Sequence, residues 1–300
     1  MIDLDLGLLF DVDGPLASTV SRTIRIPSII ANLVSLTAAG VPIAFITGRS
    51  DTFIREQVVA PLLEAGLADA FESPNARMFG VFEKGGSWAE ITANGMSVVS
   101  VDDSVALPAT VIDSIRTLVV DRFSDTMFFD ESKLAMISVE QRTDVSSERY
   151  YPDQALFNDA SFDLLASAGL GVRLRNRAVP DARGEVPFRL DPTVISTDIE
   201  SVSLDKDHAA KRAIAYFGER GPLPHHWRSI GDSRSDYLMA DHLHHAGFDV
   251  AHVDVRPLDG ILDRPYPILT EGNLIHDEAG AAFLERLVCS LSPYRSARPA

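Results

Sequence analysis

The chain has 300 residues, 46% of them hydrophobic and 23% charged, and its formal net charge is −16. This length exceeds one average domain and suits two, and no stretch approaches the ~18 consecutive apolar residues of a membrane-spanning helix. A strongly acidic chain is poorly suited to nucleic acid, because that affinity comes largely from Lys and Arg at the phosphates. We therefore expect neither a nucleic-acid nor a membrane partner, whereas a small anionic ligand is compatible with local cations in a cleft.

The cysteine content and the first residues indicate the cytoplasm. Cys289 is the single cysteine, which excludes an internal disulfide and argues against a thiolate metal site. Acidic residues follow Met1 where a secretory leader carries Lys or Arg, and the apolar run 6–10 is short for such a leader. We expect a cytoplasmic protein, and the sequence does not indicate an oligomeric state.

The first third of the chain alternates between short apolar runs and segments with helical spacing of apolar residues. The predicted strands are residues 6–10, 41–46 and 78–82. The predicted helices are residues 24–39 and 53–66, and the second is interrupted near Pro61. Strands buried on both faces have continuous apolar sequences, and strands that alternate with helices form parallel sheets. This part of the chain therefore predicts an α/β fold.

The pattern changes near Gly85 and Gly86 and returns after residue 199. Between these points, alternating segments are interleaved with predicted helices at residues 109–123 and 152–168, which indicates a separate α+β unit. The later part has a predicted helix at 206–220, strands that end at Ile230, Val255 and Leu269, and a last helix at 273–291. We predict a core domain of residues 1–85 and 200–300, interrupted by an inserted domain of residues 86–199.

Two polar clusters directly follow predicted strands, where open α/β sheets bind their ligands. Asp11 and Asp13 come after the first strand, and two carboxylates there can act as nucleophile and proton carrier. Taken alone, the pair is also typical of a turn that ends a strand. Thr47, Gly48 and Arg49 follow the second strand, where a hydroxyl and backbone N–H groups either bind an anion or cap a helix.

Two further clusters supply a cation and more carboxylates. Lys206 precedes a predicted helix and can neutralise an attacking carboxylate, although a lone lysine is more often a solvated surface residue. Asp232 and Asp236 follow the strand that ends at Ile230, and their oxygens suit Mg²⁺ as well as an acidic turn. Together the four clusters provide the nucleophile, acid, charge neutralisation and metal site that phosphoryl transfer requires.

These motifs and their order resemble those of the haloacid dehalogenase-like (HAD) phosphohydrolase superfamily. The residues that carry the resemblance are Asp11-Val12-Asp13-Gly14, Thr47, Lys206, Gly231-Asp232 and Asp236. An insert between Thr47 and Lys206 resembles the C2-type cap of Cof-like sugar phosphatases, sucrose-phosphatases and phosphomannomutases. The resemblance implies a Rossmann-like parallel-sheet core with an inserted α+β C2-type cap domain.

The resemblance also implies catalytic roles and a cofactor, Mg²⁺. Asp11 would be the nucleophile and a metal ligand. Asp13 would be the general acid and base and would lend its backbone carbonyl to Mg²⁺. Lys206 would stabilise the transferring phosphoryl group.

The remaining matched residues would bind the phosphoryl group and the metal. Thr47, with Gly48 and Arg49, would hold the phosphoryl group. Asp232 would complete the metal site, and Asp236 would support that site or orient the lysine.

Some positions depart from the pattern of the superfamily. Pro15 stands where many members have Thr, Asp207 where many C2-capped members have Gly, and Ser235 where that subgroup often has Asn. Lys84 replaces Asn in an element that resembles Glu-Asn-Gly-Gly. None of these departures removes a group that the chemistry requires.

We therefore predict a Mg²⁺-dependent phosphatase that hydrolyses a small phosphomonoester, a sugar phosphate or a phospho-carboxylate, through an aspartyl-phosphate on Asp11. Two alternatives stay open. A phosphomutase of the phosphomannomutase type would return the phosphoryl group to the product and depend on a bisphosphate activator. A non-catalytic module that binds a phosphorylated ligand would have no need of Asp13.

Three arginines suggest a further anion site. Arg173, Arg175 and Arg177 would share one face if they lie on a single strand. That face could bind a second anionic group of a substrate. The pattern is more typical of a charged sheet edge, which discourages pairing with other chains.

Overall fold

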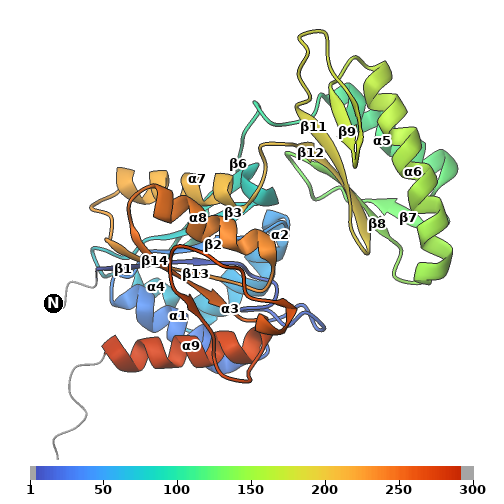
Figure 1. Cartoon of the computed structure of the whole chain (residues 1–300). Helices are drawn as coiled ribbons and strands as arrows, with labels where there is room; N and C mark the ends of the chain where they lie inside the picture. The colour runs from blue at the N-terminus through green and yellow to red at the C-terminus, as the bar shows by residue number, and fades with distance from the viewer. Residues whose placement is uncertain (1–4, 292–300) are drawn as a thin grey trace, which may run out of the picture. The chain divides into compact units, whose positions relative to one another are not determined.

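The computed structural model describes residues 5–291, which form two compact units (Figure 1). The first unit comprises residues 5–100 and 205–291, and the second comprises residues 101–204. Residues 1–4, on which the expectation about a secretory leader partly depends, lie outside the described range. Within that range, every helix is too short or too polar to span a bilayer.

The first unit is built on a largely parallel sheet. Its strands are β1 (Leu6–Phe10), β2 (Ile43–Ile46), β3 (Met78–Phe82), β4 (Ser87–Thr92), β5 (Gly95–Met96), β6 (Ser100–Val101), β13 (His226–Gly231), β14 (Asp249–Asp254) and β15 (Ile268–Leu269). Neighbouring strands are parallel in the order β15–β14–β13–β1–β2–β3. β4 and β5 extend this sheet in antiparallel orientation, and β6 pairs with β4. The predicted α/β fold with a parallel sheet is confirmed.

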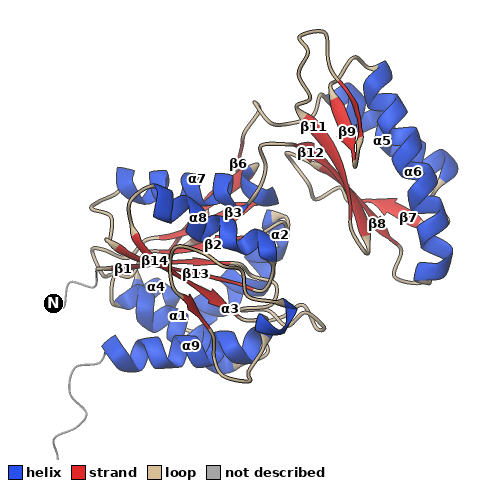
Figure 2. Cartoon of the chain, viewed as in Figure 1, coloured by secondary structure: helices blue, strands red, loops and turns tan. Residues whose placement is uncertain are grey.

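Helices cover both faces of this sheet (Figures 1 and 2). They are α1 (Pro27–Ala38), α2 (Asp51–Ile54), the π turn η1 (Arg55–Val59), α3 (Ala60–Glu64), α4 (Leu67–Ala70), the 3₁₀ turns η2 (Glu83–Gly85), η3 (Arg234–Asp236) and η4 (Pro257–Asp259), α7 (Lys206–Glu219), α8 (Tyr237–His245) and α9 (His276–Leu291). α1 and α9 lie on one face, and α7 and α8 lie on the other (Figure 1). The predicted helix 53–66 is divided, because Pro61 has no N–H and the preceding residues wind into the π turn.

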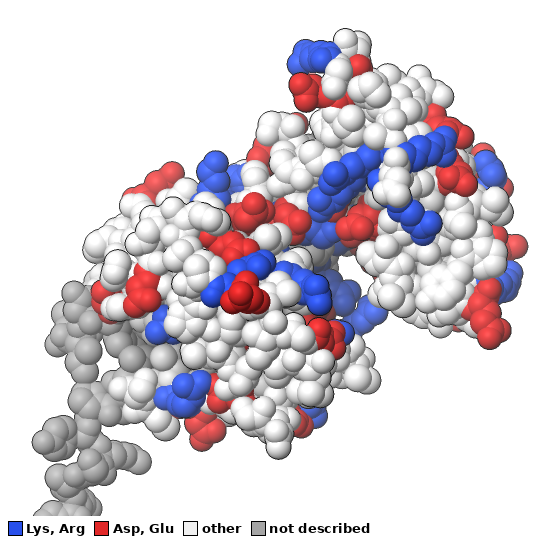
Figure 3. Space-filling model, viewed as in Figure 1, with Lys and Arg blue, Asp and Glu red and all other residues white. Residues whose placement is uncertain are grey.

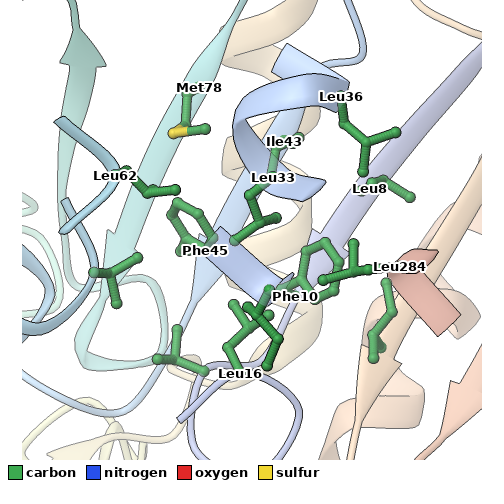
Figure 4. Packing of buried hydrophobic residues seen from close by; sticks show 14 of the residues in the cluster. Leu8, Phe10, Leu16, Leu33, Leu36, Ile43, Phe45, Leu62, Met78 and Leu284 are labelled. Atoms are coloured by element: carbon green, nitrogen blue, oxygen red, sulfur yellow. The ribbon is translucent and has the colours of Figure 1, made fainter. Parts of the chain in front are cut away.

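Apolar side chains fill the layer between the sheet and the α1–α9 face (Figure 4). β1, β2 and β3 contribute large residues that contact side chains of α1, α3 and α9, among them Leu8, Phe10, Ile43, Phe45, Met78, Leu33, Leu36, Leu62 and Leu284. The opposite layer contains Trp227, which is fully buried beside three small residues of α7, Ala209, Ala210 and Ala213. Both faces of β1 and β2 are therefore buried, as their continuous apolar sequences predict.

The first predicted domain boundary, at residues 85 and 86, is wrong. The structure places it at residues 100 and 101, because β4 pairs with β3 from Ser87 opposite Phe82 to Ile91 opposite Met78. Gly85 and Gly86 belong to a reversal within the core sheet. The second boundary falls between residues 204 and 205, close to the predicted residue 199.

The second unit is an α+β layer structure. Its elements are α5 (Ala109–Arg122), β7 (Met127–Phe129), β8 (Ile137–Gln141), α6 (Ser147–Ser167), β9 (Val172–Leu174), β10 (Arg177–Val179), β11 (Phe188–Pro192) and β12 (Ser196–Ser201). The strand order among the described residues is β10–β9–β11–β12–β8–β7, with only β9 and β11 parallel. α5 and α6 pack on one face of this sheet through a separate apolar core (Figure 2). An inserted α+β unit is therefore confirmed.

Arg173, Arg175 and Arg177 do not share one strand. β9 ends at Leu174, Arg175 turns the chain with φ 54°, and Arg177 begins β10 at the edge of the sheet. Arg177 forms ion pairs with Asp159 and Asp163 of α6. These contacts agree with a charged sheet edge and not with a common anion-binding face.

A buried histidine lies in the core of the first unit. His252 on β14 is fully buried, and its Nδ1 lies 2.8 Å from the Ser229 hydroxyl on β13. The imidazole ring packs against Tyr237, with 4.1 Å between ring centroids. Burial lowers the pKa of His252 to about 4, so the ring is neutral in the folded protein at neutral pH.

We expect His252 to weaken the fold as the pH falls. Unfolding returns the imidazole to a pKa near 6.5, so between pH 6.5 and 4 the unfolded chain binds a proton that the folded chain does not. The free energy of unfolding should therefore fall through this window, by roughly 2–3 kcal/mol from this group. Urea unfolding of wild type and His252→Gln from pH 7.5 to 4.5 measures the difference. Parallel pH profiles for the two proteins would contradict this prediction.

Candidate active site

The predicted polar clusters lie at one edge of the core sheet. β13, β1 and β2 are neighbours, and their carboxyl ends lead directly into Asp232, Asp11 and Thr47. The Asp11 N–H donates to the Ile230 carbonyl (2.8 Å), which continues the β1–β13 pairing past the last strand residue. The sheet topology thus brings together residues that are more than two hundred positions apart in the sequence.

Lys206 connects these strand ends from the first turn of α7. The Asp205 side chain caps this helix by accepting from the Lys206 N–H (2.9 Å). The ammonium Nζ lies 2.6 Å from Asp11 Oδ1 and 2.8 Å from Asp236 Oδ1, and it donates to the Ile46 carbonyl (3.0 Å). Lys206 is only 7% exposed, so the alternative of a solvated surface lysine is wrong.

Asp236 is held by the turn that follows β13. Its Oδ2 accepts from the N–H of Asp232 (3.1 Å), from the N–H of Ser233 (2.9 Å) and from the Ser233 hydroxyl (2.7 Å). A Cβ on Gly231 would lie 2.1 Å from Asp236 Cβ, so only glycine fits there. With one oxygen in this turn and the other facing Lys206, Asp236 fixes the position of the ammonium.

Three carboxylates form a group that could hold a metal ion. Asp11, Asp232 and Asp236 each offer one oxygen, and these oxygens lie within 4.8 Å of one another. Burial, and then the charge of Asp236, raises the pKa of Asp11 well above its usual value and that of Asp232 to about 6. Burial alone would lower the pKa of Lys206, but Asp11 and Asp236 raise it. Burial also opposes ionisation of Asp236, yet Lys206 and Ser233 keep its pKa low.

The donor set and its charge fit Mg²⁺. Hard carboxylate oxygens are the ligands that this ion prefers. Three carboxylates and one ammonium leave two negative charges, which one divalent cation would neutralise. Burial first, and then the negative charge of Asp236, raise the pKa values of Asp11 and Asp232, so the ionised carboxylates gain from a nearby cation. The Asp13 carboxylate lies outside this group.

Asp13 is paired with Arg49. The guanidinium donates to both carboxylate oxygens, from Nε to Oδ2 and from a terminal nitrogen to Oδ1, each at 3.0 Å. Both side chains are about 30% exposed, with Arg49 at 28% and Asp13 at 32%, and Arg49 also lies over the Phe53 ring. Arg49 was predicted to lie in the phosphoryl site, but its pair with Asp13, which joins the ends of β1 and β2, was not predicted.

Thr47 and Gly48 begin the turn after β2. The Thr47 side chain is almost fully buried, and its Oγ1 accepts from the Arg49 N–H (3.0 Å). A hydroxyl that accepts one hydrogen bond still has its own hydrogen to donate. Thr47 can therefore donate to an anion, as its predicted role requires.

A histidine that the sequence did not predict as a site residue lies beside the acidic group. His276 lies at the start of α9, and its ring Nδ1 is 3.4 Å from Asp232 Oδ2. Its backbone N–H donates to the Val255 carbonyl (2.7 Å). The neighbouring Asp277 is buried, and its two carboxylate oxygens accept from Nε and a terminal nitrogen of Arg25 (2.6 and 3.0 Å), which anchors the start of the helix. No motif or spacing in the sequence marks His276.

Solved structures share this fold. The structure of the C. albicans trehalose-6-phosphate phosphatase C-terminal domain superposes with a TM-score of 0.56 at 12% identity, covering 96% of this chain and 93% of that chain. A haloacid dehalogenase-like hydrolase from Bacteroides thetaiotaomicron gives 0.54 at 12% identity, covering 94% and 98%. Trehalose-6-phosphate phosphatase from Aspergillus fumigatus gives 0.51 at 14% identity, covering 95% and 92%.

These similarities are structural. The sequence matches no protein-family model and no curated protein. At 12–14% identity the superpositions show the fold, which is the haloacid dehalogenase-like fold with an inserted domain. The fold that the motifs predict is thereby confirmed.

α9 packs directly against the loop that carries Asp13. A Cβ on Gly280 would lie 1.8 Å from the Pro15 carbonyl oxygen, a backbone atom that cannot rotate away. Gly218 in α7 is a matched case, because a Cβ there would meet only the Leu223 side chain at 3.6 Å. The loop after β1 can approach α9 so closely because residue 280 has no side chain.

We expect Gly280→Ala to destabilise the protein by about 1–3 kcal/mol, although alanine is the better helix former. Gly218→Ala should be neutral or slightly stabilising. Urea unfolding of both variants measures the difference. Equal stability of the two variants would refute the close packing of α9 on this loop.

Proposed function

We propose that the chain is a Mg²⁺-dependent phosphatase of the haloacid dehalogenase-like superfamily that hydrolyses a small phosphomonoester through an aspartyl-phosphate on Asp11. The observation that carries the proposal is the buried ammonium of Lys206, in contact with both Asp11 and Asp236 beside Thr47. A strand-terminating turn has no need of a buried lysine at its first carboxylate. An attacking carboxylate does, because the charge of Lys206 favours its ionised form and can stabilise the charge on a phosphoryl group.

Each residue would act at a defined step. An oxygen of Asp11 attacks phosphorus while the bond to the leaving oxygen breaks and Asp13 gives that oxygen its proton. The Asp13 carboxylate then takes a proton from a water that attacks the aspartyl-phosphate, which releases phosphate and restores Asp11. Thr47 donates to the phosphoryl oxygens. Asp11, Asp232 and Asp236 would hold Mg²⁺ together with the Asp13 carbonyl, and the ion would neutralise phosphoryl charge.

Arg49 would change partners during this cycle. While it donates to both oxygens of Asp13, it occupies an acceptor site on each and holds that carboxylate against the guanidinium instead of a leaving group. An incoming phosphoryl group offers the guanidinium a more highly charged partner, and Arg–phosphate pairs are commonly bidentate. Transfer of Arg49 from Asp13 to the phosphoryl group would bind substrate and release the proton carrier together.

The second unit would be a C2-type cap domain. Its place in the sequence between Thr47 and Lys206 and its α+β composition support this assignment. Two of the structural neighbours are named as trehalose-6-phosphate phosphatases, so sugar phosphates belong in a substrate screen beside phospho-carboxylates. We also propose that the protein acts in the cytoplasm, in keeping with its single cysteine.

We expect Asp11→Asn to abolish Mg²⁺-dependent phosphate release from p-nitrophenyl phosphate, because an amide oxygen is a poor nucleophile. Asp69→Asn is a control for the same chemical change at an exposed position of α4. Removal of Mg²⁺ with EDTA should stop the wild type, and addition of the ion should restore it. Robust activity in Asp11→Asn would overturn the mechanism.

Asp13→Asn should separate the two half-reactions. Loss of the proton carrier typically slows a step by 10²–10⁴-fold, and p-nitrophenol leaves without protonation, so hydrolysis of the intermediate should be affected most. We expect a burst of p-nitrophenol and a hydroxylamine-labile phosphoprotein that Asp11→Asn does not form. If the phosphoprotein of the wild type instead transfers its phosphoryl group to an added sugar phosphate, the mutase alternative holds.

A further inference from the structure

The turn after β3 has an unusual backbone. Glu83, Lys84 and Gly85 are three successive residues with positive φ, at 49°, 55° and 106°. The left-handed region is common for glycine but disfavoured for Glu and Lys, so two of these residues are strained. Strain of this kind persists only where the surroundings impose it, and it often marks a functional position.

Neighbouring elements impose this conformation. The N–H of Glu83 donates to the Arg49 carbonyl (3.2 Å), and the N–H of Lys84 donates to the Thr47 carbonyl (3.0 Å). Glu83 is fully buried and accepts from the Ser87 hydroxyl (2.8 Å). The turn is therefore attached to the phosphoryl-binding loop by two backbone hydrogen bonds.

The same turn also contacts α7. A Cβ on Gly85 would lie 2.6 Å from the His208 ring and 3.1 Å from the Ala209 nitrogen, so the chain passes the start of this helix without clearance for a side chain. The start of α7 is also where Lys206 lies. The turn at 83–85 thus connects the two elements that supply Thr47 and Lys206.

The Lys84 side chain runs along the phosphoryl-binding loop. Its Cε lies 3.8 Å and its Cγ 4.0 Å from the position that a Cβ of Gly48 would occupy. Lys84 is half-buried, so solvent and a ligand can reach it. The 27 basic residues of the chain include four lysines, at positions 84, 133, 206 and 211, and two of these four belong to this one region.

The strand order separates Lys84 from Asp11 by more than the distance between Asp11 and a phosphoryl group that it would attack. Asp11, Thr47 and Lys84 follow β1, β2 and β3, which are consecutive in the sheet. Adjacent strands are about 4.8 Å apart, so the Lys84 backbone lies about 10 Å across the sheet from that of Asp11. A cation at that distance suits a group on the alcohol part of the substrate.

We propose that Lys84 recognises a second anionic group, a carboxylate or a second phosphate, on the alcohol part of the phosphomonoester. This inference rests on the proposed function and narrows its substrate class. The strained turn fixes where the lysine leaves the backbone, and the bonds to the Thr47 and Arg49 carbonyls couple it to the phosphoryl-binding loop. One substrate could then bridge the two sites.

Pairs of substrates that differ only in the second anion test the proposal. One pair is 3-phosphoglycerate and glycerol 3-phosphate, and the other is glucose 1,6-bisphosphate and glucose 6-phosphate. In at least one pair we expect the wild type to favour the substrate with the second anion roughly tenfold or more in kcat/KM, as charged hydrogen bonds allow. A preference in the first pair identifies a carboxylate, and a preference in the second identifies a phosphate.

The variant of choice is Lys84→Asn, because asparagine tolerates the left-handed region and keeps the turn while removing the charge. It should reduce the wild-type preference at least tenfold, mainly through KM, with a much smaller loss on p-nitrophenyl phosphate. Lys84→Arg should retain part of the preference. Lys211→Asn, at an exposed position of α7, should change nothing.

Two results would overturn the inference while the phosphatase stands. One is a wild type that hydrolyses p-nitrophenyl phosphate through Asp11 without preference in either pair. The other is an equal loss on every substrate in Lys84→Asn, which would assign Lys84 a structural role. Failure of the wild type to release phosphate from any of these substrates would overturn the proposed function, and this inference with it.

Discussion

The rest of the site depends on the contacts of the buried Lys206 ammonium. Its ion pairs with Asp11 and Asp236 and its bond to the Ile46 carbonyl connect the ends of β1, β2 and β13 to α7. A buried charge is tolerated only with well-placed partners, and loss of one partner typically costs 3–5 kcal/mol. The carboxylate that would attack phosphorus is therefore also part of what keeps the core folded, and the same contacts that orient it hold the sheet edge together.

Close backbone approach lets these groups converge. Gly14, with φ 97°, would place a Cβ 2.7 Å from the Asp232 carboxyl carbon, and Gly231 would place one even closer to Asp236. At both positions a missing side chain brings a carboxylate against the neighbouring loop. The acidic group thus stays small enough for one ion, and its mutual repulsion is relieved by Lys206 and by the N–H groups that donate to Asp236.

The sequence could predict the position of these residues because strand ends are a local property. Apolar runs such as 6–10 and 78–82 mark buried strands, and parallel strands align their carboxyl ends, so Asp11, Thr47 and Asp232 could be placed together before any coordinates. Strand Ser87–Thr92 was assigned to the inserted domain because the sequence pattern changes near Gly85 and Gly86. The pairs Arg49–Asp13 and His276–Asp232 could not be predicted, because they depend on side-chain directions in loops that periodicity does not describe.

An acidic protein can bind a dianion if cations are concentrated at the binding site. On the face drawn in Figure 3, acidic and basic side chains are interspersed, so the excess of acidic residues does not form a single patch on that face. At the sheet edge, one divalent ion would balance the three carboxylates and Lys206, and the substrate would still bring its own negative charge. The next cations along the carboxyl ends of the strands, Arg49 after β2 and Lys84 after β3, would bind that charge. Arg49 is already paired with Asp13, so a substrate whose only anion is the phosphoryl group would have to separate that pair without help from a second anion. In the proposed scheme, a substrate with a second anion would also contact Lys84, and this further interaction would favour the exchange that releases Asp13.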